Sequence, residues 1–174
     1  IKAWNAILLE IPNERILLLN KLKTNFNIFL LSNTNSIHIK ELIYKLGVKK
    51  YNEFYSVFKK VYYSHEIGLR KPNPEIFKLI IKENNLKIQN ILFIDDSTQH
   101  IESAKKIGVF THHLLKHETI ETIFPDIAQH FIIASDIILI CSSTEKTCNV
   151  DHTKMRHIIL SVLMQNIALF YVGR

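Results

Sequence analysis

At 174 residues, the chain is long enough for one domain with a buried core, or for one domain with a tail. Hydrophobic residues make up 47% and charged residues 22% of it, which is ordinary for a soluble globular protein, and the net charge of +6 is spread along the chain. The two cysteines, Cys141 and Cys148, are too few and wrongly spaced for a disulfide framework or a Cys-x-x-Cys metal site, so a reducing cytoplasm is the simplest setting.

Segments with helical periodicity alternate along the chain with short apolar runs. Asn13 is a plausible N-cap for the first helix, Gly47 stops the second, and Asn73 with Pro74 starts the third. The order predicted is helix 14–23, strand 27–32, helix 36–47, strand 60–64, helix 74–85, strand 91–95, helix 97–108 and strand 109–114. Strands alternating with helices predict an α/β fold, a Rossmann-like parallel sheet with helices on both faces and right-handed crossovers.

The stretch ILFIDDS, residues 91–97, ends a buried strand with two adjacent carboxylates, Asp95 and Asp96. Each carboxylate disfavours ionisation of the other, and a shared cation would relieve that repulsion. Mg²⁺, a hard ion that takes oxygen ligands, is the usual candidate. The alternative is that Asp96 and Ser97 cap the helix that follows. These residues alone leave both interpretations open.

Other polar residues are expected at the same edge of the sheet. Ser32 and Asn33 end the first strand, and Lys71 lies in the connection that leaves the second. In parallel sheets the ligand sits beyond the carboxyl ends of the strands. A hydroxyl and amide pair, an ammonium group and two carboxylates together suit phosphoryl transfer, where catalysis is mostly positioning and neutralisation of charge.

Three further stretches invite other functions. The basic and aromatic segment 48–63 suggests a nucleic-acid surface, but its aromatics serve equally well in a core, and we expect no nucleic-acid partner. The apolar run 155–172 is interrupted by polar residues. A helix packed on the core, a partner-binding helix and a non-native extension are the alternatives, of which we rank packing first, and membrane insertion is disfavoured. His112, His113 and His117 lack Cys or carboxylates at ligand spacing, so a metal site there is disfavoured.

Three motifs resemble those of the haloacid dehalogenase-like (HAD) hydrolase superfamily. They are LLSNTN at 30–35, GLRKPNPEIF at 68–77 and ILFIDDSTQHIESAKKIG at 91–108, in the order and at the intervals of that superfamily. The chain is most similar to the branch with a helical cap, which includes sugar-phosphate phosphatases. The resemblance covers roughly residues 3 to 124.

The resemblance implies a role for each matching residue. Ser32 and the backbone amide of Asn33 would hold the phosphoryl oxygens, Lys71 would offset negative charge, and Asp95 and Asp96 would bind Mg²⁺. The implied reaction is hydrolysis of a small phosphorylated metabolite, such as a sugar phosphate, through an aspartyl-phosphate. Metal-free dehalogenation, which the acidic pair disfavours, and a non-catalytic phosphate-binding module are the alternatives. The oligomeric state is not predicted.

One departure from the family pattern concerns the nucleophile. The family uses Asp-x-Asp at the end of a first strand, whereas this sequence contains no Asp-x-Asp. We therefore expect a truncated and inactive piece that lacks the first strand and most of the cap. The expected division is 1–12 as the end of the cap, 13–127 as the HAD-like core and 128–174 as an extension of unknown role.

Overall fold

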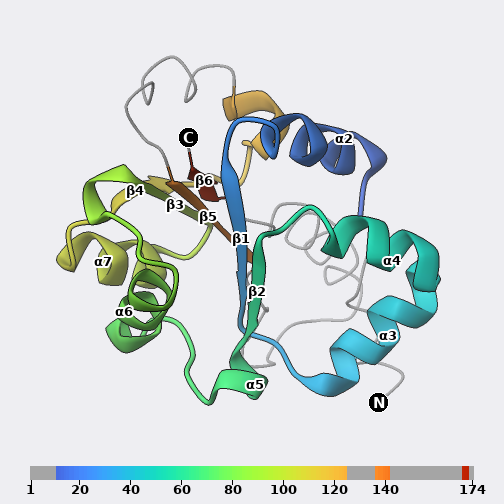
Figure 1. Ribbon diagram of the computed structural model, residues 1–174, viewed down its shortest axis with the longest axis horizontal. Coiled ribbons are helices and arrows are strands. Elements are labelled where there is room, and N and C mark those ends of the chain that lie inside the picture. The colour runs from blue at the N-terminus through green and yellow to red at the C-terminus, as the bar shows by residue number, and fades with distance from the viewer. Residues whose placement is uncertain (1–10, 125–135, 142–169, 173–174) are drawn as a thin grey trace.

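The computed structural model describes residues 11–124, 136–141 and 170–172, and these form one six-stranded sheet with helices packed around it (Figure 1). The strands are β1 (Asn27–Ser32), β2 (Lys60–Tyr63), β3 (Ile91–Asp95), β4 (Phe110–His113), β5 (Asp136–Cys141) and β6 (Phe170–Val172). The helices are α2 (Asn13–Leu22), α3 (Ser36–Leu46), α4 (Val48–Tyr55), α5 (Ser64–Ile67), α6 (Pro74–Glu83) and α7 (Thr98–Lys106).

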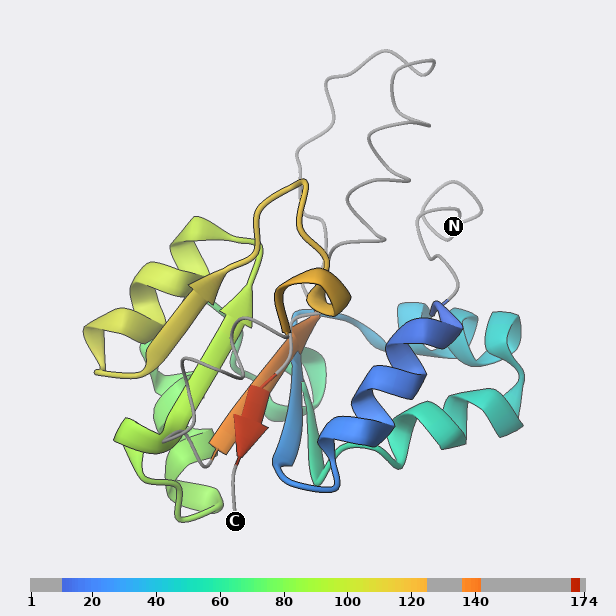
Figure 2. The ribbon, with the colours of Figure 1, turned by 90° about the horizontal axis from the view of Figure 1, so that it is seen from above.

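The strand order is β2-β1-β5-β6-β3-β4. The pairs β1–β2, β1–β5, β3–β5 and β3–β4 are all parallel. β5 pairs with both β1 and β3, whereas β6 is antiparallel to β3 and β5. Seen from above, α6 and α7 lie beside β3 and β4, and α2, α3 and α4 lie on the side of β1 (Figure 2). The predicted α/β class, with a Rossmann-like parallel sheet, is confirmed.

The two strands that carry predicted site residues are deeply buried. Every residue of β3 is buried, and so is all of β1 except Asn27. Unbroken apolar runs are typical of parallel strands that are covered on both faces. The Phe77 ring of α6 packs edge-on against Phe93 of β3, with 4.9 Å between centroids. This contact packs α6 against the middle of β3.

Most of the predicted helix boundaries lie within one or two residues of those observed. The Asn73 side chain accepts a hydrogen bond from the Glu75 amide, and Pro74 occupies the first turn of α6. Gly47 ends α3 with a φ of 76°, in the region that glycine adopts without strain. The first helix differs slightly, because Pro12 rather than Asn13 occupies its N-cap position. Periodicity and cap residues therefore located these elements well.

The basic and aromatic segment 48–63 contributes most of its rings to the core, whereas Tyr55 is 43% exposed. Phe54 of α4 contacts Phe58 edge-on at 5.0 Å, and both are buried together with Tyr62 and Tyr63. Buried rings are not accessible for stacking on bases, so this finding favours the core interpretation of the segment.

Residues 136–141 and 170–172 lie within the sheet itself, which the division of the sequence at residue 127 did not anticipate. β5 is the strand that joins β1 to β3. The apolar run 155–172 lies outside the described residues except for its last three. Within the described segments, none of the helices has the length and hydropathy that crossing a bilayer would require.

Candidate active site at the carboxyl edge of the sheet

Lys71 and Asp95 form a fully buried ion pair at the carboxyl edge of the sheet. The Lys71 Nζ lies 3.1 Å from Asp95 Oδ2, and neither side chain is exposed to solvent. The same ammonium group donates to the Leu31 carbonyl at 3.3 Å, in the strand that ends at Ser32. The ammonium group of one loop therefore contacts both β1 and β3, as the topology predicted.

The Asn33 side chain holds the backbone of Lys71 in place. Its Nδ2 donates to the Lys71 carbonyl at 2.9 Å, and its Oδ1 accepts from the Lys71 amide at 3.0 Å. A reciprocal pair of hydrogen bonds fixes both the distance and the direction of the two segments. The family motif indicates a role only for the backbone amide of Asn33, and nothing in the sequence indicates that its side chain makes this clamp.

Ser32 lies at the last position of β1 and is buried, level with Tyr63 of β2 and Cys141 of β5. A second reciprocal pair of hydrogen bonds joins Thr34, two residues further along the chain, to Ser64. Thr34 donates its amide to Ser64 Oγ, and Ser64 donates its hydroxyl to the Thr34 carbonyl, each at 3.0 Å. The turn after β1 is thus fixed to the end of β2 on one side and to the loop of the site lysine on the other.

Asp95 accepts hydrogen bonds on both oxygens. Oδ1 accepts from the Ser97 amide at 2.6 Å and from His100 Nδ1 at 2.9 Å, whereas Oδ2 faces Lys71. Burial raises the pKa of this carboxyl, but the Lys71 cation and the hydrogen bond from His100 outweigh it, and the net pKa lies below the ordinary value. Asp95 is therefore a carboxylate at neutral pH.

The arrangement changes the electrostatic argument made from the sequence. From the sequence, a shared cation was expected to relieve the repulsion between Asp95 and Asp96. In the structure, Lys71 already balances the charge of Asp95. The capping alternative gains no support from Ser97, which occupies the N-cap position of α7 without a side-chain cap hydrogen bond.

Asp96 is half-buried and follows the last residue of β3. His113, at the end of β4, donates Nε2–H to the Asp96 carbonyl at 3.1 Å. His112 lies near Glu118, with 3.4 Å between Nε2 and Oε2. His113 therefore supports the acidic pair through the backbone, a role that the sequence spacing of the histidines does not reveal.

The acidic pair suits Mg²⁺ in its donor chemistry. Two carboxylates on adjacent residues supply hard oxygen donors, and Mg²⁺ usually keeps several waters and binds through one or two carboxylates plus substrate phosphate. Among the described residues, no group of three or more His, Cys, Asp or Glu side chains gathers closely enough to enclose a metal ion. Asp95 and Asp96 would hold Mg²⁺ as a partly hydrated ion.

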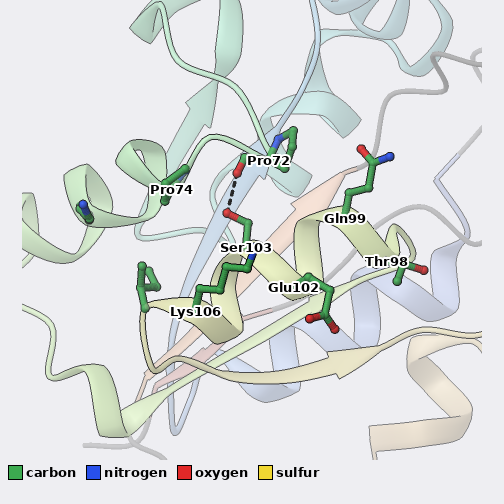
Figure 3. Close-up of a pocket in the computed structure, with 9 residues that line it drawn as sticks. Pro72, Pro74, Thr98, Gln99, Glu102, Ser103 and Lys106 are labelled. Carbon is green, nitrogen blue, oxygen red and sulfur yellow. Dashed lines mark hydrogen bonds between the residues drawn. The ribbon is translucent and has the colours of Figure 1, made fainter.

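A separate pocket of about 640 Å³ lies between α6 and α7 (Figure 3). Pro72 and Pro74 line one side of it, and Glu102, Ser103 and Lys106 of α7 line the other. None of the five predicted site residues lines this pocket. Its wall nevertheless includes a contact with the loop of the site lysine, because Ser103 Oγ donates to the Pro72 carbonyl.

Comparison with known proteins identifies the family. The pattern of the haloacid dehalogenase-like hydrolases matches residues 8–114, which is more than half of the chain, and the chain belongs to this family. The predicted resemblance is thereby confirmed.

Two curated relatives are phosphatases. D-ribitol-5-phosphate phosphatase of Bacteroides thetaiotaomicron is 28% identical over 113 residues, which are 63% of this chain and 53% of that protein. Glyceraldehyde 3-phosphate phosphatase of Pyrococcus abyssi is 28% identical over 107 residues, 61% of this chain and 42% of that protein. The chain thus spans about half the length of these curated relatives.

Solved structures agree with the fold. A HAD family enzyme of B. thetaiotaomicron, crystallised as a magnesium complex, superposes with a TM-score of 0.63 at 33% identity, over 71% of this chain and 62% of that one. The same enzyme was also crystallised with magnesium and inorganic phosphate.

Proposed function

We propose that this chain is the larger part of the catalytic core of a Mg²⁺-dependent phosphatase that hydrolyses small phosphorylated metabolites, with sugar phosphates as the substrate class. The observation that carries the proposal is the convergence of Ser32, Asn33, Lys71 and Asp95 at one edge of the sheet. The two relatives named as phosphatases of phosphorylated sugar derivatives support the substrate class. The low cysteine content is ordinary for a cytoplasmic protein, which is the location we propose.

Each residue has a distinct task in this proposal. Ser32 and the amide of Asn33 bind the oxygens of the phosphoryl group. Lys71 supplies fixed positive charge where negative charge accumulates, and the Asn33 side chain holds it there. Asp95 and Asp96 hold Mg²⁺, which when bound neutralises phosphate charge.

The attacking carboxylate is the missing component. In the reaction that the family performs, an Asp oxygen bonds to phosphorus, the ester oxygen leaves, and water then cleaves the aspartyl-phosphate. The sequence contains no Asp-x-Asp. We therefore propose that the 174 residues alone bind phosphate without turnover, as a non-catalytic phosphate-binding module also would.

The position of β5 bears on how a nucleophile is added. The candidate site lies at the carboxyl ends of β1 and β3, and β5 pairs with both of these strands in the sheet. A supplied strand that ends in Asp-x-Asp would compete with residues 136–141 for the same neighbours. The fusion protein is therefore prepared in two forms, one with and one without residues 128–174.

The experiment fuses a first-strand segment carrying Asp-x-Asp before Ile1 and measures phosphate release from small phosphomonoesters with Mg²⁺. The matched control carries Asn-x-Asn in the same segment. We expect turnover only with Asp-x-Asp, and more of it when residues 128–174 are absent. Equal turnover by the unmodified chain would contradict the assignment of the nucleophile. Phosphate binding by both fusions without turnover would favour the binding module.

A further inference from the structure

The inward face of α7 carries two buried polar residues, one of which contacts the candidate site while the other contacts the residue next to Lys71. His100 and Ser103 are three positions apart and therefore share one face of the helix. His100 contacts Asp95. Ser103 donates to the carbonyl of Pro72, the residue that follows Lys71 in the chain, as the dashed line in Figure 3 shows. Helix α7 thus contacts one member of the buried ion pair directly and the immediate neighbour of the other.

The proton on His100 can be assigned from its partner. Asp95 Oδ1 accepts the Ser97 amide and Asp95 Oδ2 accepts from the Lys71 ammonium group, so both oxygens of this side chain act as hydrogen-bond acceptors. The ring nitrogen 2.9 Å from Asp95 Oδ1 must therefore carry a hydrogen. This fixes His100 with hydrogen on Nδ1, a form that hydrogen bonding selects over the alternative tautomer.

Three donors define the orientation of the Asp95 carboxylate. The Ser97 amide and His100 Nδ1 both approach Oδ1, which leaves Oδ2 to face Lys71. Without His100, the buried carboxylate would keep only the Ser97 amide as a donor to Oδ1. The carboxylate could then rotate, so that either oxygen would face the Lys71 ammonium group. Loss of a group that orients a metal-binding side chain typically weakens binding by about 10- to 100-fold.

We propose that His100 is a positioning residue that holds the Asp95 carboxylate in the orientation needed for Mg²⁺ and phosphate to bind. The proposal rests on the function proposed above, since it assigns Asp95 to that site. It concerns a residue to which the sequence motifs assign no role. His100 itself acts through Asp95 and does not touch the phosphate.

The first test reads the hydrogen bond without any ligand. Correlation spectra of the ¹⁵N-labelled imidazole, recorded on the full chain at about pH 8, where an ordinary histidine is neutral, report which ring nitrogen carries hydrogen. We expect hydrogen on Nδ1 of His100 in the unaltered chain and a shift toward the Nε2–H form in Asp95→Leu. Absence of hydrogen from Nδ1 of His100 in the unaltered chain would overturn the proposal, whether or not phosphate binds.

The second test measures binding of inorganic phosphate in the presence of Mg²⁺ by calorimetry. We expect His100→Leu to weaken binding roughly 10-fold or more, and His100→Asn, which retains a donor, to recover part of the loss. Gln99→Ala alters an exposed residue of the same helix and should bind as the unaltered chain does. Thermal unfolding of each variant identifies any general loss of fold.

The outcomes separate the two proposals. Unchanged phosphate affinity in a folded His100→Leu chain would overturn the positioning role and leave the phosphate site intact. Absence of phosphate binding in the unaltered chain would contradict the proposed function, and with it the role of His100, even where the Nδ1 hydrogen is observed.

Discussion

Lys71 and Asp95 contact each other at 3.1 Å with both side chains shielded from water, and this pair joins the loop after α5 to the end of β3. Removing one member of a buried pair leaves the other charge without compensation, which usually costs roughly 3–5 kcal/mol. We therefore expect Lys71→Met to lower the free energy of unfolding by about 3 kcal/mol or more. Urea denaturation measures this loss.

The matched control is the double variant Lys71→Met with Asp95→Leu. Replacing both charges with apolar groups is often close to neutral, because no buried charge remains. We expect the double variant to be more stable than Lys71→Met alone. If the double variant lost as much unfolding free energy as the two single variants lose together, the two groups would not interact.

Stability should also depend on pH through Asp95. Because its pKa is lower in the folded chain than the ordinary 3.8, the unfolded chain takes up the proton first as pH falls. The stability that the ionised group contributes is present in full above about pH 5 and is lost progressively as pH falls through the folded-state pKa. Glu121 has a lowered pKa too, and acts with the same sign.

Urea denaturation from neutral pH down to acidic pH checks this dependence in the unaltered chain and in Asp95→Asn. The variant should be less stable at neutral pH and should lose less stability on acidification, since Glu121 remains in both chains. Parallel curves for the two chains would contradict an ionised Asp95 at neutral pH.

Arg15 and Glu121 connect α2 to the residues that follow β4. Arg15 Nε and Nη2 donate to the two carboxylate oxygens at 2.8 and 3.1 Å, and the Arg15 side chain is only 3% exposed. Hydrogen bonds to charged groups contribute more than neutral ones, so Arg15→Met should lower the free energy of unfolding by roughly 1–3 kcal/mol. Chemical denaturation of the variant measures this loss.

The exposed pair Lys78–Glu75 provides the control for that measurement, because solvent screens it. Lys78→Met should hardly change the unfolding midpoint. Similar losses in Arg15→Met and Lys78→Met would mean that burial of the Arg15 pair has no energetic consequence.

Residues 136–141 should be essential for cooperative folding, because β5 pairs with β1 on one side and with β3 on the other. We expect a chain that ends at residue 127 to unfold at lower denaturant and over a broader range. A chain that ends at Cys141 keeps β5 and should retain most of the stability. Identical unfolding curves for the shortened chain ending at residue 127 and the full chain would show that β5 contributes nothing.

Much of the site was predictable because the carboxyl ends of parallel strands meet at one edge. The apolar runs at 27–32 and 91–95 are both strands, so chain order and strand direction alone place Ser32 and Asp95 at that edge. Lys71 follows from the position of its loop after the second strand. These placements needed no knowledge of side-chain contacts.

Other features could not be read from the sequence, for physical reasons. DIILIC at 136–141 is one short apolar run among several, and strand pairing depends on which neighbours lack a partner, not on periodicity. The Asn33 clamp depends on a side-chain rotamer. The contact of His100 depends on how α7 is rotated about its axis, which the loop 96–97 sets.

The central claim is that the edge formed by Ser32, Lys71 and Asp95 binds phosphate together with Mg²⁺. Calorimetric titration of inorganic phosphate into the full chain, with and without Mg²⁺, tests it most directly, with Ser32→Ala as the matched variant. The account predicts binding that needs Mg²⁺ and is at least several-fold weaker in Ser32→Ala. No heat of binding and no thermal stabilisation with both ions present would contradict it.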